Sequence, residues 1–360
     1  MLKTLCSGLL IFVFFLVVAS ILLSSFKENL SGVNNCRRVK VEPNLKPGTC
    51  ACVVGASNGL GKDLANILAD AGVQVIVTGR SKQRAERALD KKSNLLLAEY
   101  LDLDDVSSIK TFAANLKDAV LRKCSGKLDY LFLNGGMVYH QPSDAHLSSD
   151  GKFDRVYSSN FLGYHKLLRE IGFSKLEATK TVFVSSVLHF GGNYDDVIWP
   201  NLNPPYSELD CLNRYSTSKL AMTTYQQYVQ RTRLLPNAIS VTCGFVKTHL
   251  LQSDREKSHL SLVQLFPTMF NSKEGAENVL NTVFVDGIKP GEFSFPYFFG
   301  FASIFDSIPS PSLRSILAIV IENLQKLTYE KDYLWICPAL PRSSNETLQK
   351  QLFDLVEREI

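Results

Sequence analysis

Hydrophobic residues along the chain fall into two alternating patterns. Short apolar runs of strand length are separated by longer segments in which apolar residues recur every three or four positions, as on one face of a helix. Strands that are apolar throughout and alternate with helices are typical of a parallel sheet covered by helices on both faces. The runs occupy 49–54, 73–78, 95–101, 128–133, 181–184 and 238–242. The pattern predicts an α/β fold with one doubly wound parallel sheet.

The first apolar stretch of the chain is longer than these runs. From Leu5 to Leu23 no residue is charged, and this length suits a helix that crosses a bilayer. A cleaved signal peptide is the alternative, but its apolar core is usually only about 7–15 residues long. We therefore expect a membrane anchor at 1–28, a polar linker at 29–48 and a single domain at 49–360.

Basic residues flank the apolar stretch unequally. One precedes it and four follow it: Lys3, then Lys27, Arg37, Arg38 and Lys40. The positive-inside tendency places the domain in the cytosol, and we expect a single-pass protein of the endoplasmic reticulum or a related endomembrane. Asn345-Glu346-Thr347 is a glycosylation acceptor. Loss of mass on glycosidase treatment would therefore indicate the opposite, lumenal orientation.

Charge and metal-ligand residues exclude several classes of protein. The net charge of +4 is spread without a basic block, which gives no case for nucleic acid. The 8 cysteines form no C-x-x-C pair, and the 6 histidines no H-E-x-x-H motif, so we expect neither a disulfide framework nor a metal site. Cys50 and Cys52 stand two apart in the first run and are interpreted as small core residues.

The first run of the domain leads into a glycine-rich turn and then a helical pattern. Glycine lets a backbone turn tightly and approach a pyrophosphate, whose charge faces the N–H groups at a helix N-terminus. A glycine-rich loop that serves only the fold is the alternative at this point. The predicted dinucleotide contacts here are Gly55, Ser57, Asn58, Gly59, Leu60 and Gly61.

The end of the second run bears on which dinucleotide is bound. Its sequence, Thr78-Gly79-Arg80-Ser81-Lys82, contains no acid. A carboxylate at this place binds the ribose hydroxyls of NAD, whereas Arg80 can bind a 2′-phosphate with help from Lys82. The alternative is that Arg80 only begins a solvated helix. The sequence predicts NADP(H).

The third and fourth runs end in further candidate cofactor contacts. Asp102, followed by Leu103, can accept a hydrogen bond from an adenine amino group, and a helix N-cap role for Asp102 or Asp104 competes with this interpretation. Asn134 and Gly135 end the fourth run, where the cofactor must pass close to the backbone.

A tyrosine and a lysine carry the candidate chemistry. Tyr215 and Lys219 are four residues apart in a helical pattern, so they share a helix face. A tyrosine loses its proton at about pH 10, and an adjacent ammonium lowers that pKa and makes the phenol a usable acid or base. Ser185 and Ser186 end the fifth run, at the sheet edge where ligands bind, and Asn160 precedes that run.

Together these elements resemble the short-chain dehydrogenase/reductase family, single-domain Rossmann-fold oxidoreductases with a nicotinamide cofactor. The likeness covers about residues 49–250 and includes Gly55-x-x-x-Gly59-x-Gly61 and Asn134-Gly135-Gly136, in which Gly135 replaces the family's alanine. Three elements are similar to the branch that contains retinol dehydrogenases and protochlorophyllide reductases: Asp150-Gly151, Asn160-Phe161-Leu162-Gly163 and Tyr215-Ser216-Thr217-Ser218-Lys219-Leu220-Ala221.

The resemblance implies a role for each matching residue. Tyr215 would be the general acid for carbonyl reduction, and Lys219 would lower its pKa and bind the nicotinamide ribose. Ser186, the second serine of the pair, would hold the substrate oxygen. Asn160 would position a water that passes protons to Lys219.

The segment after the sixth run departs from the family in one respect. Val246 and Thr248 match cofactor contacts, but Cys243-Gly244 replaces the usual Pro-Gly, so a looser turn is expected.

The last part of the chain extends beyond the usual family pattern. The segment near 288–333 is interpreted as an insertion, either a helix that covers the core or a membrane-surface contact or lid. A final helix is expected at 343–357, with a capping box between Ser343 and Glu346.

The sequence therefore favours a membrane-anchored reductase that uses NADP(H) on a lipophilic carbonyl or alcohol, such as a retinoid or long-chain aldehyde. A hydroxysteroid or keto-sterol dehydrogenase is the second enzymatic interpretation, and a catalytically idle cofactor-binding scaffold is the third. A homodimer is implied by the resemblance alone.

Overall fold

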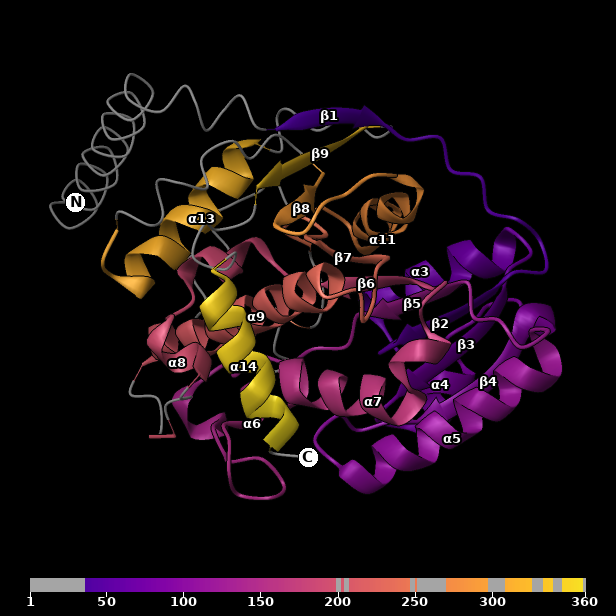
Figure 1. Ribbon diagram of the computed structural model, residues 1–360, viewed down its shortest axis with the longest axis horizontal. Helices are drawn as coiled ribbons and strands as arrows, with labels where there is room; N and C mark the ends of the chain where they lie inside the picture. Colours follow the sequence, from indigo (N-terminus) through magenta and orange to yellow (C-terminus); the bar gives the residue numbers. More distant parts are fainter. Residues whose placement is uncertain are drawn as a thin grey trace, which may run out of the picture.

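The sheet confirms the parallel α/β prediction (Figure 1). The computed structural model describes residues 36–198, 202–203, 207–246, 250, 270–296, 308–325, 333–338 and 345–358. These residues form a 9-stranded sheet in the order β1-β9-β8-β7-β6-β5-β2-β3-β4. The strands are β1 (Arg37–Lys40), β2 (Cys50–Val54), β3 (Gln74–Gly79), β4 (Leu95–Tyr100), β5 (Tyr130–Leu133), β6 (Lys180–Val184), β7 (Ala238–Val241), β8 (Glu292–Phe295) and β9 (Tyr333–Pro338). The six predicted strands are all present as β2 to β7.

Helices cover both faces of this sheet, as predicted. α3 packs against α11 on one face, and α5 packs against α7 on the other (Figure 1). The helices are α3 (Gly59–Asp70), α4 (Lys82–Glu86), α5 (Val106–Lys123), α6 (Arg155–Tyr157), α7 (Gly163–Ile171), α8 (Asp195–Ile198), α9 (Glu208–Arg231), α11 (Ser272–Asn281), α13 (Pro311–Gln325) and α14 (Glu346–Arg358).

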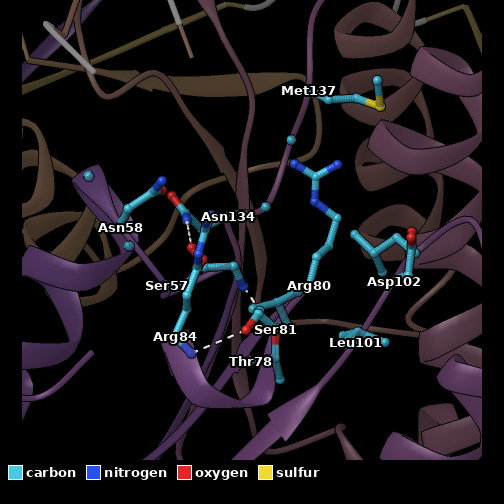
Figure 2. Close-up of a pocket in the computed structure, with 18 of the residues that line it drawn as sticks. Ser57, Asn58, Thr78, Arg80, Ser81, Arg84, Leu101, Asp102, Asn134 and Met137 are labelled. Atoms are coloured by element: carbon cyan, nitrogen blue, oxygen red, sulfur yellow. Dashed lines mark hydrogen bonds between the residues drawn. The ribbon is translucent and has the colours of Figure 1, made fainter. Parts of the chain in front are cut away.

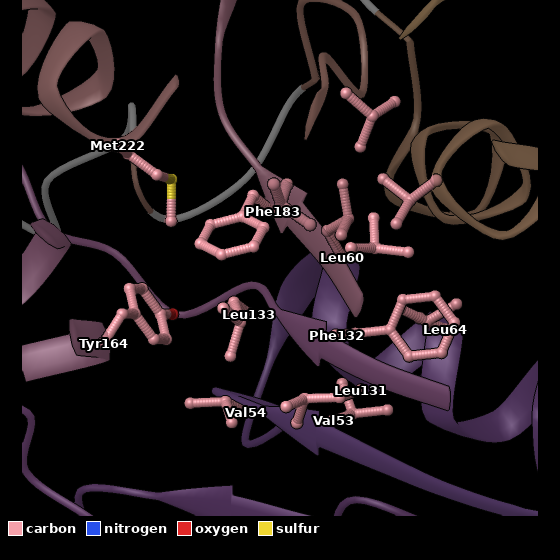
Figure 3. Packing of buried hydrophobic residues seen from close by; sticks show 14 of the residues in the cluster. Val53, Val54, Leu60, Leu64, Leu131, Phe132, Leu133, Tyr164, Phe183 and Met222 are labelled. Atoms are coloured by element: carbon pink, nitrogen blue, oxygen red, sulfur yellow. The ribbon is translucent and has the colours of Figure 1, made fainter. Parts of the chain in front are cut away.

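The core lies between the central strands and the helices on either side. All residues of β2 are buried, which is the reason for its continuous apolar run. Figure 3 shows Leu60 and Leu64 of α3 on one side of the central strands, and Tyr164 of α7 and Met222 of α9 on the other. Helices that bury one apolar face each against such a sheet fix its strands in register.

The strand order reverses between β2 and β5. The chain runs outward from β2 through β3 to β4 and then returns to β5, which pairs with the opposite side of β2. In open parallel sheets ligands bind in the crevice at the carboxyl ends of the strands, at the point of reversal. The fold therefore places the ends of β2 and β5 at the centre of any ligand site.

The segment predicted as a linker contributes a strand. Arg37–Lys40 forms β1, which pairs antiparallel with β9, and β9 in turn pairs antiparallel with β8. The sequence signal was weak because β1 alternates half-buried and exposed positions and contains three basic residues.

The expectation that the cysteines form no disulfide framework is wrong. Cys36 is bonded to Cys337 and Cys50 to Cys124, at sequence separations of 301 and 74. Pairs this far apart have no local spacing that a motif search can recognise. Cys52 is unbonded and buried, as expected for a core residue.

The C-terminal elements pack onto the domain. In α13 the residues from Leu317 to Ile321 are buried, and the helix packs on α9 and on the segment Val187–Gly191, so the core-covering interpretation of the insertion is supported. The final helix is confirmed, but it begins at Glu346, and Asn345 accepts the backbone N–H of Leu348 (3.1 Å) as its cap. Ser343, the predicted cap, lies outside the described residues.

The predicted membrane anchor at 1–28 also lies outside the described residues. Within the part of the chain that the structure describes, no helix is both long and apolar enough to cross a membrane.

The substitution Gly163→Ala tests how closely α7 packs against the loop after β4 at the ligand-binding edge. A Cβ at Gly163 would overlap the backbone of Leu103, which follows β4, so Gly163→Ala must push α7 away from that loop. We expect a loss of about 1–3 kcal/mol in the free energy of unfolding by urea, although alanine favours the helix itself. Gly275→Ala in α11 is the comparison, because its new methyl group meets side-chain atoms of Val246 (2.6 Å) and Leu60 (3.1 Å) and no backbone atom, so we expect a smaller loss. Equal stability of the two variants would contradict this account.

Candidate cofactor and active site

A pocket of about 800 Å³ opens at the carboxyl edge of the sheet where the strand order reverses (Figure 2). It is lined by the turn after β2, the ends of β3 and β4, and the segment after β5. The predicted cofactor contacts found in its wall are Gly55, Ser57, Asn58, Gly59, Leu60, Gly61, Arg80, Asp102, Leu103, Asn134 and Gly135. Residues far apart in the sequence thus meet in one cavity because their strands are neighbours.

The glycine turn is a close backbone contact that no side chain could enter. A Cβ at Gly61 would overlap the carbonyl oxygen of Gly55, and one at Gly55 would lie 2.5 Å from the Cα of Gly135. Gly55 also has a φ of +78°, which disfavours other residues. The Asn134 amide donates to the Gly55 carbonyl (3.0 Å), which fixes this turn to the end of β5. The backbone is therefore open to an anionic ligand at the beginning of α3.

Positive charge collects at the end of β3. The Arg80 side chain extends into the pocket, and Arg84 and Arg87 line it as well (Figure 2). The hydroxyl of Ser81 caps α4 by accepting the N–H of Arg84 (3.4 Å). Lys82, expected to assist Arg80, instead pairs with Glu99 (3.4 Å).

Asp102 lines the pocket but does not cap a helix. It accepts the N–H of Asp104 (3.0 Å) and lies 3.5 Å from a guanidinium nitrogen of Arg155. The cap of α5 is Asp105, which accepts the N–H of Ser107, so the N-cap interpretation of Asp102 and Asp104 is wrong.

Lys219 is held next to the catalytic edge by the long helix α9. Its ammonium donates to the Val184 carbonyl (2.8 Å) at the end of β6 and is buried. Loss of water on burial lowers the pKa of Lys219 to about 8. The ammonium lies 5.7 Å from the centre of the Tyr215 ring, so the two residues share a face as predicted.

Asn160 lies in a single turn of π-helix, Ser158–Leu162, which leads directly into α7. Such turns are frequent at functional sites because they displace one side chain from the regular helix surface. The Asn160 amide accepts the N–H of Met137 (2.8 Å) and donates to the Met137 carbonyl (2.9 Å) and the Ser218 hydroxyl (3.0 Å). It therefore joins the segment after β5 to α9.

The two serines after β6 have different surroundings. Ser185 is buried, and its hydroxyl bonds with the Lys219 carbonyl (3.2 Å) and the Thr223 hydroxyl (2.9 Å). Ser186 is only half-buried, and its hydroxyl accepts the N–H of Leu188 (3.2 Å). Ser185 thus anchors α9 to the sheet, and Ser186 is the one more accessible from the edge.

Of the two predicted contacts after the sixth run, Val246 does not line the pocket. Val246 is buried beside Phe270, and Thr248 is not among the described residues. In the turn before them, a Cβ at Gly244 would lie 2.6 Å from the Phe270 ring, so this position requires glycine. Several further lining residues were not among the predicted cofactor contacts: Thr78, Ser81, Arg84, Arg87, Leu101, Met137 and Ser159.

Comparisons with known proteins agree with this arrangement. A family model described as short chain dehydrogenase matches residues 49–195. Human retinol dehydrogenase 12 is 28% identical over 263 residues, which are 68% of this chain and 76% of that protein. Mouse retinol dehydrogenase 13 is 30% identical over 57% of this chain and 60% of its own length.

Two further matches concern an enzyme and a solved structure. Human polyprenol dehydrogenase is 27% identical over 62% of this chain and 67% of its own length. The crystal structure of an uncharacterized protein from Mycobacterium paratuberculosis is similar with a TM-score of 0.58 and 22% identity, and covers 88% of this chain and 95% of that one. This structural likeness concerns the fold alone.

The burial of Lys219 predicts how stability depends on pH. Its pKa in the folded protein is about 8, below the 10.5 of an ordinary solvated lysine, so at lower pH both states carry the charge and the folded state bears the cost of burying it. As pH rises from 8 to 10.5 the folded state loses its proton first, and stability increases. Relative to Lys219→Met, the wild type should gain on the order of 3 kcal/mol in unfolding free energy across this window.

This difference is measured by urea unfolding of both proteins at a series of pH values. Because other groups titrate in both proteins alike, only the difference between the two curves reports on Lys219. If the difference in unfolding free energy between the two proteins did not change with pH, burial of the Lys219 ammonium would be contradicted.

Proposed function

Because the chain belongs to the short-chain dehydrogenase/reductase family, with relatives named as retinol dehydrogenases, we propose that it transfers a hydride between NADP(H) and a lipophilic carbonyl or alcohol. One observation carries the proposal. A Cβ built on Gly136 would lie 3.4 Å from the Asn160 amide oxygen and 3.6 Å from the Lys219 ammonium, so both groups converge on the segment that follows the cofactor-binding glycines.

The pocket suits a phosphorylated dinucleotide in shape and charge. The contacting backbones of Gly55, Gly61 and Gly135 leave a cradle without side chains, and the end of β3 presents an arginine where an NAD-binding site has a carboxylate. Asp102, which follows the neighbouring strand β4, supplies a hydrogen-bond acceptor for an adenine amino group. The bound nicotinamide supplies or accepts the hydride.

The chain's own residues manage the proton and the substrate oxygen. Ser186 and Tyr215 donate hydrogen bonds to the carbonyl oxygen, and Tyr215 transfers its proton as negative charge develops there. Lys219 stabilises the phenolate that remains. Asn160 acts as a positioning residue, since its amide holds the segment after β5 against α9.

The lipophilic substrate class rests on the relatives and on the predicted anchor. Retinol and polyprenol, the substrates in the relatives' names, are long apolar alcohols. An apolar helix at 1–28 would hold the domain at the membrane, where such molecules dissolve. The single-domain division at 49–360 and the homodimer remain part of this proposal.

Tyr215→Phe tests the reaction. Loss of the phenolic proton should lower the rate of NADPH-dependent reduction by roughly 100- to 10,000-fold, while NADPH affinity changes little. The full-length protein in detergent is assayed against retinal, long-chain aldehydes and ketosteroids, and NADPH binding is followed by fluorescence. Turnover of ketosteroids alone would favour the hydroxysteroid alternative. Tight NADPH binding without any turnover, in either direction, would favour an idle scaffold.

Arg80→Ala tests the choice of cofactor. Removal of a charged hydrogen-bond donor to the 2′-phosphate should weaken NADPH binding by roughly 10- to 100-fold and leave NADH binding unchanged. Lys82→Ala is the matched control, because Lys82 pairs with Glu99 and should keep the wild-type preference. An Arg80→Ala protein that still prefers NADPH to the same degree would refute this role.

A further inference from the structure

Two disulfides fasten separate parts of the domain. Cys50–Cys124 ties the first residue of β2 to the residue that follows α5. Cys36–Cys337 ties the residue before β1 to β9, and the pairing of Arg37 with Ile336 places these two cysteines opposite each other on adjacent strands. Both bridges therefore join elements that the fold itself holds side by side.

The positions of these bridges fit a structural role. None of the four cysteines lines the cofactor pocket, and Cys50, Cys124 and Cys337 are buried. Redox-active cysteine pairs are accessible and lie beside the reacting groups, and these two pairs do neither. Structural disulfides persist in the lumen of the secretory pathway and outside the cell, whereas the cytosol keeps such thiols reduced.

The glycosylation acceptor is independent evidence on the same question. Asn345 and Thr347 are both exposed, at the beginning of α14. A sequon serves as a glycan acceptor only on the lumenal side of the membrane and only where the chain is accessible. Its exposure on the folded domain meets the second condition.

The basic residues that favoured the cytosol have another explanation. Three of the four downstream ones lie in β1, where Arg37 pairs with Glu292 (3.3 Å), Arg38 stacks on the Tyr333 ring (3.7 Å) and Lys40 pairs with Glu42 (3.0 Å). These contacts account for their presence in the strand. When these three residues are left out of the charge count, one basic residue remains on each side of the apolar stretch, Lys3 before it and Lys27 after it.

We propose that the catalytic domain folds on the lumenal side of an endomembrane, where both disulfides form and Asn345 carries an N-linked glycan. This replaces the cytosolic orientation expected from the charge count. Each pair of thiols loses two protons and two electrons to a disulfide-bearing oxidoreductase of that compartment and forms one S–S bond. The Asn345 amide nitrogen loses a proton and displaces the pyrophosphate of a lipid-linked oligosaccharide.

Glycosidase treatment of the full-length protein from mammalian cells tests the orientation. We expect a loss of mass on treatment, and a smaller or absent loss in Thr347→Ala, which removes the sequon but leaves the Asn345 cap of α14 in place. Thr347→Ser keeps the sequon and should behave as the wild type. A second sequon, Asn29-Leu30-Ser31, lies outside the described residues, so Asn29→Gln is examined in parallel.

Thiol counting tests the disulfides in the same material. The protein is denatured without reductant and labelled with a maleimide, and we expect four more labels after reduction, at the cysteines of the two bridges. A loss of mass unchanged by Thr347→Ala would overturn Asn345 as the acceptor. All 8 cysteines labelled without reductant, together with no glycan, would overturn the proposal as a whole. Neither result would touch the proposed hydride transfer, which the Tyr215→Phe assay decides separately.

Discussion

The contact between the backbones of Gly55, Gly61 and Gly135 sets the geometry of the ligand-binding edge. Because no Cβ fits at Gly55 or Gly61, the end of β2 lies in close backbone contact with both the start of α3 and the end of β5. The adjacent strands β3 and β4 then place Arg80 and Asp102 next to each other in the wall of the same cavity (Figure 2). The shape of the pocket thus follows from the glycine contacts, and the charge in its wall follows from the strand order.

The chemical half depends on how α9 is held. Its Lys219 ammonium donates to the Val184 carbonyl. The Ser185 hydroxyl bonds with Lys219 and Thr223, which are one turn apart on α9, so the helix is held against the end of β6. Helix α13 adds support from outside, since its buried Arg314 donates to the Gly192 carbonyl (2.9 Å) and the Ser315 and Ser216 hydroxyls are 3.2 Å apart. This helix therefore stabilises the loop that follows Ser186.

Much of this arrangement could be predicted from the sequence, for identifiable reasons. The central strands β2, β3, β5, β6 and β7 are buried on both faces and so appear as continuous apolar runs, and the glycine turn follows the first of them directly. The half-buried edge strand β4 is recognisable by its consecutive leucines. The edge strand β1 could not be found this way, because it is half exposed and its partner β9 is nearly the whole chain away. The disulfides could not be predicted for the same reason, because their cysteines are far apart in the sequence. The cap of α5 was misplaced because three acids, Asp102, Asp104 and Asp105, stand within four residues. Local signals predicted local structure, whereas pairing between distant segments could be seen only in the fold.

Transfer of isotope from the cofactor to the substrate tests the central claim most directly. The full-length protein would be given NADPH carrying deuterium at C4 and an excess of retinal or a long-chain aldehyde, and the alcohol formed would be analysed by mass spectrometry. The account predicts one deuterium on the former carbonyl carbon with the wild type, and almost none with Tyr215→Phe under the same conditions. Tight NADPH binding with no deuterium in any alcohol, or equal transfer by both proteins, would contradict it.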